Sequence, residues 1–176
     1  MAETMIKGKN IYLRDIRLSD TENIVFWRNQ DFVREHFLMK ESLTPEMHFE
    51  WMKTKVSAGT VVQFIIGILG TETEIGSVYF RDVDGKEKSA EFGIFIGDRK
   101  YAGQGYGYEA MCLAMEYALC RMGLETIRLR VLEENKAAMH VYKKYGFMVR
   151  PGEEEWIASE NGKQKVIFME YYRGKS

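Results

Sequence analysis

One stretch of the chain limits its possible folds more than any other: a strand-like run, then glycines at alternate positions, then a long amphipathic segment. Residues 94–107 read Ile-Phe-Ile-Gly-Asp-Arg-Lys-Tyr-Ala-Gly-Gln-Gly-Tyr-Gly. Alternate glycines allow a backbone curl in which successive N–H groups point inward. The helix N-terminus that follows adds unpaired donors and a partial positive charge. The stretch therefore predicts a strand–turn–helix unit that binds an anion such as a diphosphate.

Two familiar nucleotide-binding loops are excluded by the glycine spacing. In G-x-G-x-x-G the third glycine would come one residue later than Gly107, and G-x-x-x-x-G-K-[ST] requires a Lys and a hydroxyl that are absent here. An isolated glycine cluster is also compatible with a simple surface turn, and the spacing alone leaves that alternative open. If the turn does bind phosphate, it belongs to another type.

Composition narrows the class of protein. The chain has 176 residues, 45% of them apolar, which is enough for one domain over 1–176 with a core over about 10–172. A formal net charge of −1 gives no support for nucleic acid as a partner. No apolar run approaches the ~18 residues of a membrane span, and the N-terminus lacks an apolar leader, so we expect a cytoplasmic protein without membrane contact. The three histidines show no ligand spacing, and no metal is expected.

Helix signals occur early and late in the chain. Ser19-Asp-Thr-Glu22 has the form of a capping box for a helix towards Asn29, and Thr44-Pro45 combines an N-cap with Pro at the first helical position. A third helix should run from about Gly107 to Met122, and Asn135 should cap a fourth that Gly146 ends.

Strand signals lie between and after these helices. Apolar or alternating runs predict strands over 10–15, 61–69, 75–81, 89–96 and 126–131, with a C-terminal hairpin of 155–159 and 165–172. Along 89–96, one face should carry Ala90, Phe92, Ile94 and Ile96 and the other Glu91, Gly93 and Phe95. The chain therefore reads as a mixed α/β domain.

Two segments together resemble the GNAT acetyltransferase superfamily. They are Ala102-Gly-Gln-Gly-Tyr-Gly107 and Glu133-Glu-Asn-Lys-Ala-Ala-Met-His-Val-Tyr-Lys-Lys-Tyr-Gly-Phe147, which lie about 30 residues apart. The N-terminal half resembles the branch that contains ribosomal-protein-alanine, polyamine and amino-sugar acetyltransferases. The resemblance implies a single GNAT-type domain: a central, mostly antiparallel twisted sheet, splayed at the cofactor site and flanked by about four helices.

The resemblance also implies acetyl-CoA as co-substrate. The strand end would pair with the pantetheine arm, and one of its N–H groups would point at the thioester oxygen. Asn135 would lie near the cofactor, although it is equally a good N-cap. Ala102 departs from the family pattern, which usually has Gln or Arg there, so Arg99 or Lys100 would supply the charge. The implied cofactor contacts are Phe95, Ile96, Gly97, Ala102, Gly103, Gln104, Gly105, Tyr106, Gly107 and Asn135.

Acetyl transfer to an amine needs a neutral amine and a proton for the leaving thiolate. An alkylamine has a pKa of roughly 10, so it must lose a proton to attack near pH 7. By resemblance to the pattern N-x-x-A-x-x-x-Y, Tyr142 would face the sulfur and protonate it. The alternative is an aromatic ring that only packs its helix.

Glu91 is the candidate base, acting directly or through a water. It lies within a strand between apolar neighbours, where a carboxylate is costly unless it has a partner or a task. Partial burial would raise its pKa and suit it to accept a proton. The equally weighted alternative is a structural ion pair with Arg81 or Arg128.

The acceptor amine should be selected by the N-terminal third of the chain. Arg28 or Arg34 would bind a substrate phosphate, and Trp27 or Trp51 would stack on a sugar or base. The competing interpretation makes both tryptophans core residues and both arginines solvated. Nucleotide-linked amino sugars, polyamines and protein N-termini all remain open as acceptors.

Two further hypotheses concern binding rather than chemistry. The fold could bind acetyl-CoA without turnover, as a sensor or interaction module, although the presence of both candidate chemical residues favours an enzyme. The apolar run Val166-Ile-Phe-Met169 reads as an exposed strand of the C-terminal hairpin, so a homodimer formed by strand pairing is also possible.

Overall fold

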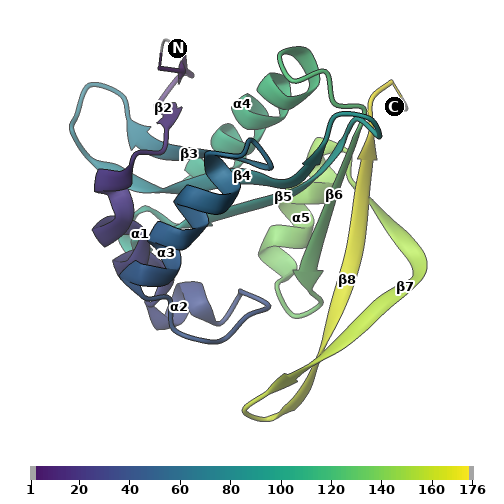
Figure 1. Cartoon of the computed structure of the whole chain (residues 1–176). Coiled ribbons are helices and arrows are strands. Elements are labelled where there is room, and N and C mark those ends of the chain that lie inside the picture. Colours follow the sequence, from purple (N-terminus) through teal and green to yellow (C-terminus); the bar gives the residue numbers. More distant parts are fainter. Residues whose placement is uncertain (1–2, 175–176) are drawn as a thin grey trace.

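A single sheet organises the molecule. The computed structural model describes residues 3–174, and its eight strands follow the order β1-β2-β3-β4-β5-β6-β8-β7 (Figure 1). All neighbouring strands are antiparallel except β5 and β6. The expected mixed, mostly antiparallel fold is confirmed. The strands are β1 (Met5–Lys7), β2 (Ile11–Asp15), β3 (Val61–Ile68), β4 (Glu74–Asp84), β5 (Ser89–Ile96), β6 (Thr126–Leu132), β7 (Met148–Ser159) and β8 (Gly162–Tyr172).

The parallel pair β5–β6 opens part-way along its length. Ser89, Ala90 and Glu91 pair with residues 126–128, but β5 continues to Ile96 and β6 to Leu132 without further pairing to each other. The strands therefore separate after Glu91, which is the expected splay. Beyond this point the backbone groups on the facing edges of β5 and β6 form no hydrogen bonds with each other.

Helices cover both faces of the sheet (Figure 1). On one face α4 and α5 bury a core that includes Phe92, and on the other α1–α3 bury a smaller core that includes Phe95. The expected alternation along β5 is therefore confirmed. The helices are α1 (Thr21–Arg28), α2 (Asp31–Arg34), α3 (Pro45–Trp51), α4 (Tyr106–Cys120) and α5 (Lys136–Tyr145), with 3₁₀ turns η1 (Leu18–Asp20) and η3 (Arg99–Tyr101) and a π-helical turn η2 (Met52–Val56).

Most of the expected helix ends are confirmed. Thr44 Oγ1 accepts from Met47 N at 3.3 Å, and Asn135 Oδ1 accepts from Ala138 N at 3.2 Å. Gly146, with a φ of 122°, follows the last residue of α5. The proposed capping box at Ser19 was wrong. Asp20 instead accepts from Arg17 N at 2.7 Å and from the Arg14 guanidinium, so η1 forms first and α1 begins at Thr21.

The C-terminal hairpin is confirmed, but its exposed strand was misassigned. β8 lies between β6 and β7, and its Val166 and Met169 are fully buried. The run 166–169 therefore has no free edge with which to pair a second chain, and the strand at this edge of the sheet is β7. Within residues 3–174, none of the helices is long and apolar enough to cross a membrane.

Candidate active site

The glycine turn connects β5 to α4 through a short helical turn. Asp98 Oδ1 accepts from Lys100 N at 2.8 Å and caps η3. Gly103 and Gly105 then adopt left-handed conformations, with φ of 71° and 86°. A residue with a Cβ is strained in this region, which explains glycine at these two positions. The turn delivers the chain directly into the first residue of α4, Tyr106.

The start of α4 presents unpaired backbone donors. No acceptor within residues 3–174 lies in hydrogen-bond range of the N–H groups of Gly105, Tyr106, Gly107 or Tyr108. Such donors at a helix N-terminus are suited to an anion. The nearest basic residues, Arg99 and Lys100, are exposed and form no ion pair with any residue the structure describes. The turn therefore fits a diphosphate group through its backbone, as a pyrophosphate-binding turn requires.

The open edge of β5 offers a second set of backbone groups. Gly97 N donates to Ile75 O at 2.7 Å, so it is already used. Hydrogen-bonded pairs alternate along an antiparallel ladder, which also turns the backbone groups of Phe95 towards β4 and those of Ile94 and Ile96 towards the gap. Of the three residues expected to pair with pantetheine, Ile96 is the one whose backbone faces the opening, and Ile94 joins it.

Tyr142 lies beside the point where the strands separate. Its ring packs edge-on against Phe92, the first residue of β5 that no longer pairs with β6, at 6.2 Å, and also contacts Phe147 at 6.0 Å. The residue is 9% exposed, and burial raises the pKa of its hydroxyl. Among residues 3–174 the hydroxyl has no hydrogen-bond partner. The ring is fixed by packing while the hydroxyl stays protonated and free to donate.

Glu91 lies on the opposite face of β5 from Phe92 and is held by two cations. Its Oε1 forms an ion pair with Arg81 on β4 and another with Arg130 on β6, the latter at 3.2 Å. Arg130 also approaches Glu155 Oε2 at 3.8 Å. The sequence had left an ion pair open as the alternative to a catalytic base, although with Arg128 rather than Arg130 as one partner. These contacts support the ion-pair interpretation.

Tyr79 is a residue that the sequence gave no reason to select. It faces Gly93 across the β4–β5 ladder, and a Cβ built at Gly93 would lie 2.2 Å from Tyr79 Cζ. Burial raises the pKa of the Tyr79 hydroxyl, while nearby Arg81 and Arg28 oppose that shift. The pKa of Tyr142 is raised mainly by burial and, to a smaller extent, by Tyr79. The glycine between Phe92 and Ile94 was the only sequence signal for this close approach.

The residues expected to bind the acceptor have different surroundings. Trp27 is 6% exposed and belongs to the core beneath Gly97, in agreement with the packing alternative. Trp51 Nε1 donates to Gln63 Oε1 at 3.1 Å, and Arg34 pairs with Asp31 at 3.2 Å. The Arg28 side chain has neither a hydrogen bond nor an ion pair with the described residues, and its guanidinium stacks on Phe37 at 3.3 Å.

Asn135 lies at a cavity near the ends of the separated strands. The cavity has a volume of about 300 Å³ and is also lined by Leu132 at the end of β6 and by Gln164 on β8. Two acidic residues, Glu35 and Glu134, complete its polar wall together with His36. The structure thus places Asn135 both as the cap of α5 and at the rim of the opening.

Comparison with known proteins decides the family. The model of the acetyltransferase (GNAT) domain matches residues 10–148. The chain belongs to the GNAT acetyltransferase family. It is accordingly an acetyl-CoA-dependent N-acetyltransferase, with the splayed sheet and the turn before α4 in the places that the family resemblance implied.

Individual relatives agree with this assignment. A probable N-acetyltransferase of Bacillus subtilis, YjcK, is 28% identical over 175 residues, covering 95% of this chain and 93% of that protein. A spermidine N(1)-acetyltransferase of Escherichia coli is 36% identical, but over 74 residues only, 42% of this chain and 39% of that protein. The solved structure of a Vibrio cholerae spermidine N-acetyltransferase, in complex with CoA and spermine, has a TM-score of 0.86 at 22% identity and covers 94% of this chain and 96% of that one.

Proposed function

We propose that this enzyme acetylates a primary amine by direct transfer, with Tyr142 as the proton donor to the departing thiolate. The observation that carries the proposal is the position of Tyr142 against Phe92, where β5 and β6 begin to separate. A protonated hydroxyl without a protein partner at this place is available to the sulfur of acetyl-CoA bound along the open edge. Positioned acids of this kind contribute about 10²–10⁴ in rate.

The binding of acetyl-CoA is assigned to backbone groups more than to side chains. The N–H groups at the start of α4 would hold the pyrophosphate, and the open edge at Ile94 and Ile96 would pair with the pantetheine arm. Acetyl-CoA supplies the activated acetyl group when bound. Ala102 does not weaken this assignment, because the donors it relies on are in the backbone.

The deprotonation of the amine is assigned to water. Glu91 was the candidate base, but its carboxylate already accepts from Arg81 and Arg130. We therefore propose that Glu91 positions these two arginines on the acceptor side of the sheet, and that the ammonium loses one proton to solvent before it enters. After the attack, the nitrogen releases a second proton, which restores the proton that Tyr142 has given to the thiolate.

An assay of thiol release tests the proposed activity. The protein is mixed with acetyl-CoA and a panel of amines that includes UDP-linked amino sugars, polyamines and peptides with free N-termini. We expect release of free thiol with at least one class, at a rate that depends on the amine concentration. Saturable binding of acetyl-CoA without thiol release across the whole panel would contradict the proposal and favour a sensor.

A further inference from the structure

Arg28 places a positive charge beside the gap between β5 and β6, on the face of the sheet that α1 covers. Arg28 ends α1, and its guanidinium stacks on Phe37, whose ring packs edge-on against Phe95 of β5 at 5.6 Å. These two contacts fix the guanidinium beside the strand that borders the gap. Because the stack uses the face of the guanidinium, its N–H donors remain directed outwards in the plane of the group.

The donors of Arg28 have no acceptor among residues 3–174. The residue is half-buried, yet within residues 3–174 it forms no hydrogen bond and no ion pair. Burial lowers the pKa of this guanidinium, because removing a charge from water without a counterion is unfavourable. An anion placed against these donors would compensate for that cost.

The groups around Arg28 add to the positive charge. Arg81 and Arg130 both pair with Glu91, which lies on the same face of β5 as Phe95, the residue against which Phe37 packs beneath Arg28. Glu91 lies between Arg81 and Arg130, and Glu155 approaches only Arg130. These two carboxylates are thus engaged by the other two arginines, and neither forms an ion pair with Arg28.

We propose that Arg28 binds an anionic group, a carboxylate or a phosphate, carried by the acceptor amine. The guanidinium fork is matched to both groups and forms paired charge-assisted hydrogen bonds with either. A polyamine has only cationic groups and offers no counterion to Arg28, although Glu35 and Glu134 line the nearby cavity. This inference rests on the proposed function, since it names the class of amine that the same site accepts.

The test separates this anion site from the turn that binds the pyrophosphate. The protein is first saturated with CoA, and inorganic phosphate or malonate is then titrated by calorimetry at constant ionic strength. We expect one further saturable site in the CoA-bound protein. Arg28→Gln should weaken it about 10- to 100-fold, the range expected for hydrogen bonds to a charged group. Phosphate and malonate, run separately, tell which anion fits better.

Matched variants keep the result interpretable. Arg17→Gln removes an exposed arginine that pairs with Glu3, and should leave the titration unchanged. Arg28→Lys keeps the charge but lacks the planar, forked donors of the guanidinium. Its affinity for the anion should lie between those of wild type and Arg28→Gln. CoA affinity should be the same in all variants, which also shows that they are folded. If Arg28→Gln weakens CoA binding itself, Arg28 belongs to the cofactor site and the proposal is overturned.

Turnover distinguishes the two proposals from each other. Phosphoethanolamine and β-alanine are compared with 1,3-diaminopropane as acceptors. Faster acetylation of the two anionic amines, lost in Arg28→Gln, supports the acceptor role. Equal or greater activity on the diamine, with no second anion site in the CoA-bound wild type, overturns the role of Arg28 and leaves acetyl transfer intact. Thiol release with no amine at all would instead contradict the proposed function.

Discussion

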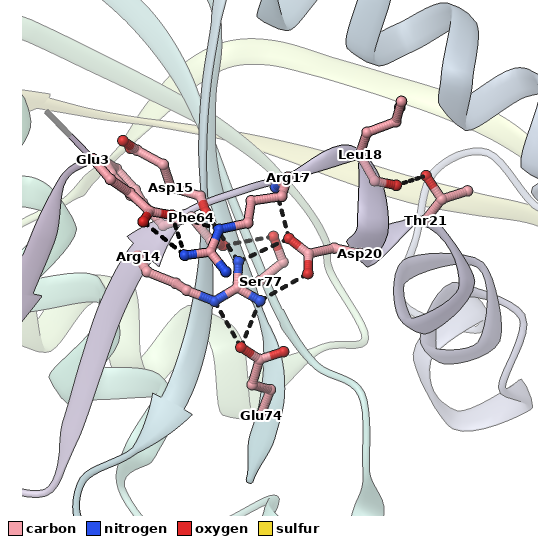
Figure 2. Close-up of polar contacts among 10 residues, drawn as sticks. All are labelled: Glu3, Arg14, Asp15, Arg17, Leu18, Asp20, Thr21, Phe64, Glu74 and Ser77. Carbon is pink, nitrogen blue, oxygen red and sulfur yellow. Dashed lines mark hydrogen bonds and ion pairs between the residues drawn. The ribbon is translucent and has the colours of Figure 1, made fainter. Parts of the chain in front are cut away.

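Arg14 and Arg28 are both withdrawn from solvent, but only Arg14 has counterions. Arg14, on β2, is 7% exposed and makes paired hydrogen bonds to Asp20 at 2.7 and 2.9 Å and a third to Glu74 at 2.7 Å (Figure 2). These partners raise the pKa of Arg14, the Asp20 contact most of all. Arg28 has an aromatic ring beneath it and no acceptor in the described chain.

This difference distinguishes polar groups that stabilise the fold from polar groups that are available to a ligand. Around Arg14 the donors and acceptors satisfy one another, so the cluster ties β2 to η1 and β4. Around the gap between β5 and β6, the Arg28 donors, the Tyr142 hydroxyl and the N–H groups at the start of α4 all lack partners in residues 3–174. Polar groups withdrawn from water are normally hydrogen-bonded, and we propose that this concentration of unpartnered groups is where substrates bind.

Removal of the Tyr142 hydroxyl should have the largest effect. Tyr142→Phe keeps the ring packed against Phe92 and deletes only the proton donor. We expect kcat to fall about 100-fold or more with little change in stability. Tyr145→Phe is the matched control, because that ring packs on Tyr171 at 5.3 Å and should leave kcat near wild type. Equal kcat values for wild type and Tyr142→Phe would remove the catalytic role.

Arg14→Ala should affect the other half of the comparison, the free energy of unfolding. It leaves the buried Asp20 and the partly buried Glu74 without their shared cation, and breaking a buried ion pair in this way costs about 3–5 kcal/mol. Urea unfolding monitored by circular dichroism measures it. Arg17→Ala, which breaks an exposed pair with Glu3, should change the free energy of unfolding far less, because water screens that pair. Similar losses of unfolding free energy in the two variants would show that the Arg14 cluster stabilises the fold no more than an exposed ion pair does.

Glu91→Gln should give a smaller loss of stability and no change in the shape of the pH–rate profile. The substitution removes the counterion of Arg81 and Arg130, and we expect a cost of about 1–3 kcal/mol. The profile of kcat/KM against pH reports the base of the free enzyme. If the acidic limb of this profile disappears in Glu91→Gln, then Glu91, rather than water, is the base that deprotonates the amine.

The smallest expected effect is a pH dependence of stability from Asp20. Burial raises the pKa of this carboxyl, but hydrogen bonds from Arg14 and the Arg17 backbone outweigh it, so the pKa is lowered. A lowered folded-state pKa contributes stability above the unfolded value of about 3.9, and the contribution is lost as pH falls through the folded value. The free energy of unfolding, measured between pH 7 and 3, should therefore fall less with decreasing pH in Asp20→Asn than in wild type. An identical slope would assign the acid loss to other carboxyls.

Local signals in the sequence were reliable where the interaction itself is local. The caps Thr44 and Asn135 and the alternation along β5 depend on residues a few positions apart, and all three are confirmed. The capping box at Ser19 failed because Arg14, on another element, engages Asp20. The exposure of 166–169 failed because strand order is a tertiary property.

The candidate site divides in the same way. The turn before α4 was predictable because glycine spacing and a helix start lie in one segment. The roles of Tyr79 and Glu91 were not, since each depends on partners from other strands, Gly93 for Tyr79 and Arg130 for Glu91. That Arg28 lacks a counterion is likewise a property of the folded chain and has no signature in sequence.

Backbone amide chemical shifts during titration with CoA test most directly whether the unpartnered groups form the substrate site. We predict the largest changes at the amides from Gly103 to Tyr108 and at Ile94 and Ile96. The amides of Arg14, Asp20 and Glu74, whose side chains satisfy one another, should not move. Saturable CoA binding that leaves the 103–108 amides unchanged would contradict the account.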